Sequence, residues 1–230
     1  MIAPTLACAD WLNLEREIAI MDQAGVDFYH IDLMDGHYVP NLCFNLDLLR
    51  AIGQISGTPL DVHLMVTNPL DYVERLSACG AKGACAHLDC LRDPGVFLEA
   101  LEKRGLKKGL ALSPGDRVEQ VSPWLERLDY VLVMLVSPGF SGQQPKAELF
   151  EKVRQLERLR QEKGLSFLIQ VDGGVSWENA GALVEWGADV LVSGVFASLD
   201  RQGELGERTR LFRACSRSLR ERCREKEGTR

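Results

Sequence analysis

Short apolar runs alternate with longer amphipathic stretches from one end of the chain to the other. The runs are four to seven residues long and rich in aliphatic and β-branched side chains. Runs of this length and composition predict strands that are buried on both faces. They fall at 2–6, 27–33, 60–65, 83–88, 107–112, 130–135, 166–171 and 189–192.

The stretches between these runs repeat their apolar residues at helical spacing, most clearly at 11–24, 69–79, 146–163 and 177–186. Asp10 is suited to cap the first of them, and Gly25 to end it. A glycine also stands between helix and strand at Gly80 and Gly187, the junction typical of a repeating βα unit. The segment from Leu112 to Tyr130 has the weakest helical pattern, which predicts a helix only over 118–124.

Strict alternation of strand and helix predicts a parallel sheet with helices packed outside it. Eight such units in 230 residues favour a closed α/β barrel, the (β/α)8 or TIM barrel, over an open doubly wound sheet. We therefore expect a single domain over 1–230. The last helix should be packed by Leu205, Leu211 and Phe212, followed by a charged, solvated tail over about 220–230.

Composition narrows the class of protein. A hydrophobic content of 46% and a charged content of 26% are those of a globular protein, with no apolar run near the ~20 residues that cross a bilayer. The N-terminal residues lack the pattern of a secretory signal, so we expect a cytoplasmic protein without a membrane partner. A net charge of −6 argues against a nucleic-acid partner. Seven irregularly spaced cysteines predict reduced thiols rather than a disulfide framework.

Candidate chemistry gathers at the predicted carboxyl ends of the strands, where barrels of this class carry their sites. His30 and Asp32 lie two apart on the second strand and so share a face, while His63 and Asp172 lie on the third and seventh strands. Singly, each histidine could be a core residue and Asp172 a helix cap. Together, two imidazoles and two carboxylates predict a site for one divalent ion, with zinc, iron, manganese and cobalt all suited.

Glycine-rich turns follow the sixth, seventh and eighth predicted strands, at 137–143, 172–174 and 193–194. Such turns let backbone N–H groups approach an anion, and the last two strands are the usual phosphate position in these barrels. No Walker lysine motif or dinucleotide glycine fingerprint is present, which argues against a nucleotide cofactor. Near these strand ends we expect Met34, Met65 and Met134 to form a wall of the pocket. His87, at the end of the fourth predicted strand, is expected to lie beside the pocket, and its spacing indicates no second ligand residue.

The run HIDLMDGHYVPN at 30–41 closely resembles the signature of the ribulose-phosphate 3-epimerases. Three further runs are similar to that family, at 61–65, 138–143 and 170–174, and the likeness extends in order from Ala3 to about Phe196. The resemblance implies a barrel of the ribulose-phosphate-binding type and a homo-oligomer. It also implies conversion of D-ribulose 5-phosphate to D-xylulose 5-phosphate through an enediolate.

The same resemblance assigns roles to individual residues. It implies that one divalent metal ion is bound by His30, Asp32, His63 and Asp172, and that Asp32 and Asp172 form the acid–base pair. The substrate contacts that it implies are made by Thr5, His63, Gly139, Phe140, Ser141, Gly142, Asp172, Gly173, Gly174, Gly194 and Val195.

Several positions depart from the family pattern. Thr5 stands where serine is usual, and Ser141 replaces a glycine. The turn after Gly194 is shortened and lacks a small polar residue, which leaves the N–H of Val195 as the candidate donor there. Residues 6–10 and 66–69 look more like those of the allulose-6-phosphate 3-epimerases. A six-carbon substrate, or a barrel that binds a sugar phosphate without catalysis, therefore remains an alternative.

Overall fold

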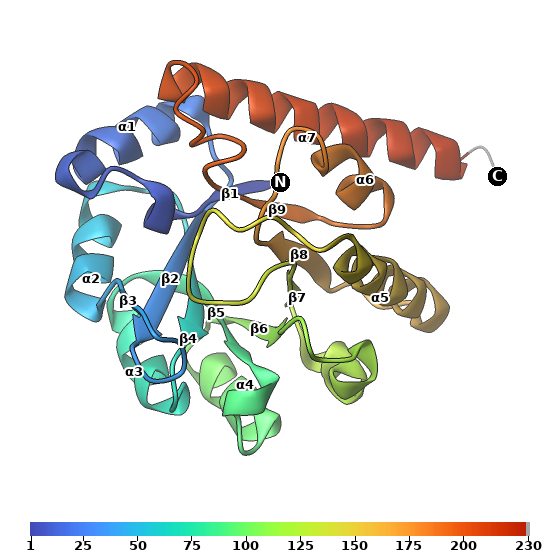
Figure 1. The fold of residues 1–230 in the computed structure, drawn as a ribbon. Helices are drawn as coiled ribbons and strands as arrows, with labels where there is room; N and C mark the ends of the chain where they lie inside the picture. Colours follow the sequence, from blue (N-terminus) through green and yellow to red (C-terminus); the bar gives the residue numbers. More distant parts are fainter. Residues whose placement is uncertain (229–230) are drawn as a thin grey trace.

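A computed structural model describes residues 1–228 of the chain. Within that range, eight parallel strands form one sheet, which curls around an axis with helices on its outer side (Figure 1). In sheet order they are β1 (Ile2–Pro4), β9 (Val190–Ser193), β8 (Leu168–Asp172), β7 (Tyr130–Met134), β6 (Lys107–Leu112), β5 (Ala81–His87), β4 (Leu60–Met65) and β2 (Tyr29–Asp35). A parallel bridge between Thr5 and His30 joins the end of β1 to β2. The predicted (β/α)8 barrel is confirmed.

The helices lie outside the barrel and fill the links between strands. They are α1 (Leu14–Ala24), α2 (Leu46–Ile55), α3 (Leu70–Ala78), α4 (Pro94–Lys103), α5 (Phe150–Lys163), α6 (Ala180–Glu185) and α7 (Leu205–Gly228). Short 3-10 turns are found at Leu6–Cys8, Trp11–Asn13, Leu88–Cys90, Val118–Gln120, Ser122–Arg127 and Ala147–Leu149. Two of them occupy the link from β6 to β7, so the weak helical pattern there corresponds to tight turns.

The predicted capping residues lie where helices begin and end. The Asp10 carboxylate accepts a hydrogen bond from the backbone N–H of Leu12 at 3.1 Å, so it caps the turn that leads into α1. Gly25, Gly80 and Gly187 each adopt a positive φ, of 76°, 91° and 111°. Only glycine adopts this conformation readily, and it turns the chain from the helix toward the next strand.

The arginine-rich helix α7 corrects two expectations. It continues to Gly228, so no tail begins near residue 220. Leu211 is half exposed and does not pack the helix, whereas Phe212 is fully buried. Figure 1 shows α7 lying along α1 and α6. Its arginines form ion pairs there: Arg213 lies 3.3 Å from the Asp27 carboxylate, and Arg220 pairs with the Asp189 carboxylate and donates to its backbone carbonyl at 2.8 Å. The prediction that the end of the chain is solvated concerns side chains after Cys223 and residues 229–230. These lie outside the described residues, so this part stays a prediction.

Two apolar regions hold the barrel together. The larger one lies between the sheet and the helices, and smaller clusters fill the barrel interior. At the amino-terminal end of the interior, Phe28 packs with Ala3 and Val190. Because Phe28 points inward, the period of two along β2 sends His30 and Asp32 inward as well. A short strand β3 (Leu42–Cys43) pairs antiparallel with the end of β2.

Other bulk features agree with the composition. The seven cysteines, all within the described residues, are free thiols. Over the same residues, no helix combines the length and apolar character needed to span a bilayer.

Candidate active site

Two histidines and two aspartates meet in the barrel at the carboxyl end of the sheet. One ligand atom from each of His30, Asp32, His63 and Asp172 lies within 4.8 Å of all the others. The Nε2 atom of His30 is 3.4 Å from Asp32 Oδ1 and 3.7 Å from Asp172 Oδ2. The Nδ1 atom of His63 is 3.3 Å and 3.9 Å from the same two oxygens. All four predicted ligands are therefore brought together.

The donor atoms of this cluster fit a divalent cation. Among the described residues, the Nε2 atom of His30 is buried without any hydrogen-bond partner, although it faces two carboxylates. Buried polar atoms in proteins normally have a hydrogen-bond partner or a bound ion. The unpaired Nε2 atom is therefore consistent with a cation bound between the four side chains. Two imidazole nitrogens with two carboxylate oxygens are the set that zinc, iron, manganese and cobalt accept.

The charges of the site also favour a cation at its centre. Burial opposes protonation of His30, but the carboxylates of Asp32 and Asp172 outweigh burial and raise its pKa to about 9. Burial would raise the pKa of Asp32, yet His30 and His63 hold it below its usual range. For Asp172, burial dominates, and its pKa is raised. Positive charge among these groups, carried by a proton or by a metal ion, stabilises two buried carboxylates.

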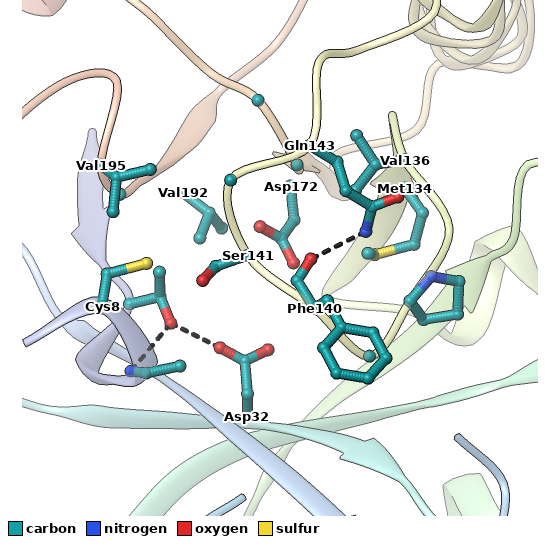
Figure 2. Close-up of a pocket in the computed structure, with 18 of the residues that line it drawn as sticks. Cys8, Asp32, Met134, Val136, Phe140, Ser141, Gln143, Asp172, Val192 and Val195 are labelled. Atoms are coloured by element: carbon teal, nitrogen blue, oxygen red, sulfur yellow. Dashed lines mark hydrogen bonds between the residues drawn. The ribbon is translucent and has the colours of Figure 1, made fainter. Parts of the chain in front are cut away.

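A pocket that is partly open to solvent lies directly above the cluster. Figure 2 shows the carboxylates of Asp32 and Asp172 directed into it. His30 and His63 are fully buried beneath, and His63 is not part of the lining. The other predicted substrate-contact and wall residues do line the pocket. These are Thr5, Met34, Met65, Met134, Gly139, Phe140, Ser141, Gly142, Asp172, Gly173, Gly174, Gly194 and Val195.

Thr5 holds one of the two carboxylates. Its hydroxyl donates a short hydrogen bond to Oδ2 of Asp32, and it accepts one from the backbone N–H of Ala7 at 3.2 Å. The threonine therefore keeps the hydroxyl function that serine has in the family pattern. With Oδ2 bonded to Thr5, Oδ1 of Asp32 remains directed at the two histidines.

The glycine-rich loops form the opposite side of the pocket. Loop 137–143 is closed on itself, because the Gln143 side chain donates to the carbonyls of Ser137 and Phe140, each at 2.8 Å. After β8, a side chain at Gly173 would place its Cβ 2.4 Å from Val136 Cγ2, and one at Gly174 would lie 2.4 Å from Pro145 Cδ. Both positions also have positive φ. Neither position accommodates a side chain, so their backbone faces the pocket bare.

A cysteine from the turn after β1, Cys8, lines the pocket beside the turn after β9. Ser193 is buried, and its hydroxyl pairs with that of Ser198 at 2.7 Å, away from the pocket. The backbone N–H of Val195 bonds the thiol of Cys8, whose pKa is raised to about 11 by burial and by Asp32. Sequence reasoning missed Cys8 as a pocket residue. Its only signal was its place in the 6–10 run that resembles the allulose-6-phosphate epimerases.

His87 has the partner that the sequence did not reveal. Its Nε2 atom is 2.8 Å from Nε2 of His63, and its Nδ1 is 2.8 Å from Ser113 Oγ. Burial and His63 lower the pKa of His87 well below its usual value. The alternation of side chains along a strand could have indicated this: His87 lies two residues after Cys85, which points into the barrel, so both share that face. His37, by contrast, is exposed, and its Nδ1 lies 2.9 Å from the carbonyl oxygen of Asp35 in the same segment.

Comparison with known proteins agrees with this geometry. The profile described as the ribulose-phosphate 3 epimerase family matches residues 1–197. Ribulose-phosphate 3-epimerase of Treponema pallidum is 40% identical over 193 residues, which is 84% of this chain and 88% of that protein. The cytoplasmic isoform of Oryza sativa subsp. japonica is 39% identical over 210 residues, 90% of each chain. The enzyme of Bacillus subtilis is 35% identical over 209 residues, 90% of this chain and 96% of the other.

Solved structures support the fold alone. A mutant tryptophan synthase alpha-subunit from Pyrococcus furiosus superposes with a TM-score of 0.66 at 13% identity, covering 94% of this chain and 96% of that one. Thiamine phosphate pyrophosphorylase from the same organism gives 0.63 at 12% identity, covering 95% of both chains. Because the barrel, the His-Asp cluster and the sequence relatives agree, the chain belongs to the ribulose-phosphate 3-epimerase family.

Proposed function

We propose that this protein interconverts D-ribulose 5-phosphate and D-xylulose 5-phosphate by inverting carbon 3. The observation that carries the proposal is the pair of carboxylates, from β2 and β8, which enter one pocket above two buried imidazoles. Epimerisation needs one group that removes a proton and a second that supplies one on the opposite face. The family membership of the chain supports the same reaction.

A divalent metal ion is the proposed cofactor, with zinc, iron, manganese or cobalt suited to the ligands. His30 would hold it through Nε2, His63 through Nδ1, and Asp32 and Asp172 through carboxylate oxygens. When bound, such an ion acts as a Lewis acid that stabilises negative charge on substrate oxygens by several kcal/mol. The imidazoles lie beneath the pocket floor, so they would orient the site without blocking the substrate.

Proton transfer is assigned to the two aspartates. The hydrogen on carbon 3 is weakly acidic because the neighbouring carbonyl accepts the electrons as an enediolate forms. One aspartate takes that proton, and the other then delivers a proton to the opposite face of the planar intermediate. In the reverse direction the two residues exchange roles. Thr5 fixes the orientation of Asp32 through its hydroxyl, and each acid–base role typically contributes about 10²–10⁴ in rate.

The phosphate is proposed to lie against the bare backbone of the glycine-rich turns. Candidate donors are the N–H groups of residues 139–142, Gly173, Gly174 and Gly194, all of which line the pocket. The N–H of Val195 would have to exchange the Cys8 thiol for the phosphate. Backbone N–H groups bind an anion without added positive charge, which suits a chain of net charge −6. The three methionines would cover the reacting carbons and exclude water.

A six-carbon ketose phosphate is the second candidate substrate. Cys8 and the shortened turn after β9 support it, because they reshape the side of the pocket where the family pattern has a small polar residue. The mechanism would be unchanged, because only the distance between the reacting carbon and the phosphate differs.

The test compares the two substrates directly. Metal-loaded protein is incubated with D-ribulose 5-phosphate or with D-allulose 6-phosphate, and carbon 3 is followed by NMR. We expect a higher kcat/KM for the five-carbon substrate. Preference for the allulose phosphate would move the protein to hexulose-phosphate epimerisation. Bound metal with turnover of neither substrate would contradict epimerase function and favour a barrel that only binds sugar phosphates.

We further propose a cytoplasmic homo-oligomer that works without nucleic-acid or membrane partners. The free thiols suit a reducing compartment. Leu12 and Leu42 are 95% and 73% exposed, and Trp11 beside Leu12 contacts Phe44 near Leu42, so the exposed apolar side chains lie close together. Clusters of this kind favour subunit contacts. Light scattering should give a mass that is a multiple of the 25.6 kDa chain, and Leu12→Glu should lower it.

A further inference from the structure

A third histidine stands behind the metal-binding histidines. His87, at the end of β5, is fully buried, and its Nε2 lies 2.8 Å from Nε2 of His63. On its other side, Nδ1 lies 2.8 Å from the hydroxyl oxygen of Ser113. The ring is flanked by those of His63 and Tyr38, with centroids 5.0 Å and 5.1 Å away. It touches neither carboxylate of the cluster, so it is outside the ligand set.

The geometry fixes where each imidazole carries its proton. His63 turns Nδ1 toward the cluster, 3.3 Å from Asp32 Oδ1. A neutral imidazole that binds a metal through Nδ1 carries its hydrogen on Nε2. Among the described residues, the acceptor within reach of that hydrogen is Nε2 of His87, which must then be the nitrogen without a hydrogen. The hydrogen of His87 is consequently on Nδ1, where it is donated to Ser113. One arrangement of hydrogens thus satisfies four buried nitrogens.

The last residue in this series of hydrogen bonds, Ser113, is held in place through its backbone by two side chains. The N–H of Ser113 donates to Asp116 Oδ2 at 2.7 Å, and the carbonyl of Ser113 accepts from Lys152 Nζ at 2.7 Å. Ser113 therefore has a defined position directly after β6. Within the described part of the chain, the ring of His63 has no backbone hydrogen-bond partner, so it obtains its orientation from Ser113 through His87.

We propose that His87 is a positioning residue, which sets the tautomer and the ring orientation of His63 so that Nδ1 faces the metal ion. The proposal rests on the metal site of the proposed function. Outer partners of metal-binding histidines typically change metal affinity by 10- to 100-fold when they are removed. His30 provides a contrast, because its outer Nδ1 meets the Gln170 amide at 3.1 Å instead of a histidine.

The test measures binding of cobalt(II) ions by competition with a chelator, in the absence of substrate. His87→Phe keeps a ring but cannot accept the hydrogen from His63, so the dissociation constant should rise about 10- to 100-fold. His87→Gln can accept from His63 and donate to Ser113, and should recover most of the affinity. The control is His37→Gln, which replaces the exposed histidine and should leave affinity unchanged.

The visible spectrum of bound cobalt supplies a second readout, because it reports the geometry of the ligands. We expect the Phe variant to shift the cobalt bands and the Gln variant to retain them. An affinity within twofold of the unmodified protein, with unchanged bands, would overturn the proposal. If the Phe variant does not fold, Ser113→Val decides instead: severalfold weaker binding is expected, and unchanged affinity overturns the proposal. Failure of the epimerase function would appear separately, as tight metal binding without turnover.

Discussion

A few side chains in the site form hydrogen bonds that orient the aspartates and histidines of the cluster. The Thr5 hydroxyl gives Asp32 one fixed oxygen, and His87 gives His63 one defined tautomer. Asp32 and Asp172 are nearly buried, yet both reach the pocket, as Figure 2 shows. A carboxylate in this position is desolvated and needs donors on one side, which leaves the other side free for chemistry.

Replacing either acid–base residue with its amide should remove catalysis. In Asp32→Asn or Asp172→Asn, the side chain cannot accept a proton, so kcat should fall by about 10²–10⁴ or more. Steady-state epimerisation assays measure this, with metal content determined on the same samples. Asp47→Asn is the matched control, since that carboxylate is 83% exposed on α2. Turnover near normal in either variant would remove that aspartate from the mechanism.

The Thr5 hydroxyl can be removed without changing the shape of the side chain. Thr5→Val deletes a hydrogen bond to a carboxylate, an interaction worth about 1.5–3 kcal/mol, so kcat should fall about 10- to 100-fold. Thr5→Ser keeps the hydroxyl and should remain within a few fold of the unmodified protein. If the valine variant is as fast as the serine variant, Thr5 does not orient Asp32.

Asp35, at the end of β2, links the loop after β2 to the loop after β4. Its carboxylate accepts from the N–H groups of His37, Tyr38 and Thr67 at 2.8–2.9 Å, and from the Thr67 hydroxyl. Burial alone would raise its pKa, but these donors, led by Thr67, hold its pKa well below the usual range. Because the folded pKa lies below the unfolded value of about 4, this stabilisation is complete above pH 4 and is lost as pH falls toward the folded pKa.

Asp35→Asn should therefore be less stable than the unmodified protein at pH 7, by about 1–2 kcal/mol. The difference should narrow below pH 4, because the Asp35 carboxylate of the unfolded protein then takes up a proton while that of the folded protein does not. Urea unfolding at pH 7, 5 and 3 measures both. A difference that stays constant over this range would mean that the charge of Asp35 does not matter.

Among the strands, β6 and β7 show how closely the barrel interior is packed. Gly109 of β6 pairs with Tyr130 of β7 on one side and Cys85 of β5 on the other. The Tyr130 ring crosses the space above Gly109, and its hydroxyl reaches Asp61 at 2.5 Å. A Cβ at position 109 would lie 2.4 Å from Cζ of that ring. The glycine is thus needed for space, because its φ is not in the left-handed region.

Gly109→Ala should destabilise the barrel by about 1–3 kcal/mol, as other insertions into packed cores do. Urea denaturation gives the value. Gly115→Ala is the control, because nothing lies within 4 Å of a Cβ there. Adding Tyr130→Leu to Gly109→Ala removes the ring and should recover part of the loss. If the alanine at 109 proves as harmless as that at 115, the close approach is relieved elsewhere.

The elements were largely predictable from sequence, because buried parallel strands leave uninterrupted apolar runs and glycine marks the junctions. All eight predicted runs became strands, with ends that differ by about two residues. Helix α7 was not predictable in full, since its arginines pair with Asp27 and Asp189 from distant parts of the chain. The His63–His87 pair was missed for a related reason: only register across β4 and β5 brings the two rings together.

For the molecule as a whole, a metal ion bound at this site would also connect strands that are distant in the chain. Its ligands come from the neighbouring strands β2 and β4 and from β8, which is distant from both in the chain and in the sheet. An ion bound only to the folded protein stabilises it by mass action. Without a cation, two buried carboxylates face each other across the barrel.

Removing the metal should therefore lower the melting temperature. At a free metal concentration about a hundredfold above the dissociation constant, the stabilisation is about 2.7 kcal/mol, or about 5–10 °C for a chain of this length. Thermal unfolding with added Mn²⁺, Co²⁺ or Zn²⁺, and after chelation, measures the shift. Asp172→Asn lacks one ligand and should show a smaller shift. Equal melting temperatures for the unmodified protein with and without metal would contradict binding at this cluster.

The central claim is that two aspartates act on opposite faces of carbon 3, and isotope labelling tests it most directly. Metal-loaded protein converts a small fraction of D-ribulose 5-phosphate in D2O, and NMR measures deuterium at carbon 3 of product and of recovered substrate. With two separate groups, the new proton comes from one that has exchanged with solvent. The account predicts that almost every xylulose 5-phosphate molecule carries deuterium, while recovered substrate carries little. Product that retains the original hydrogen would mean that one group serves both faces, and would contradict the account.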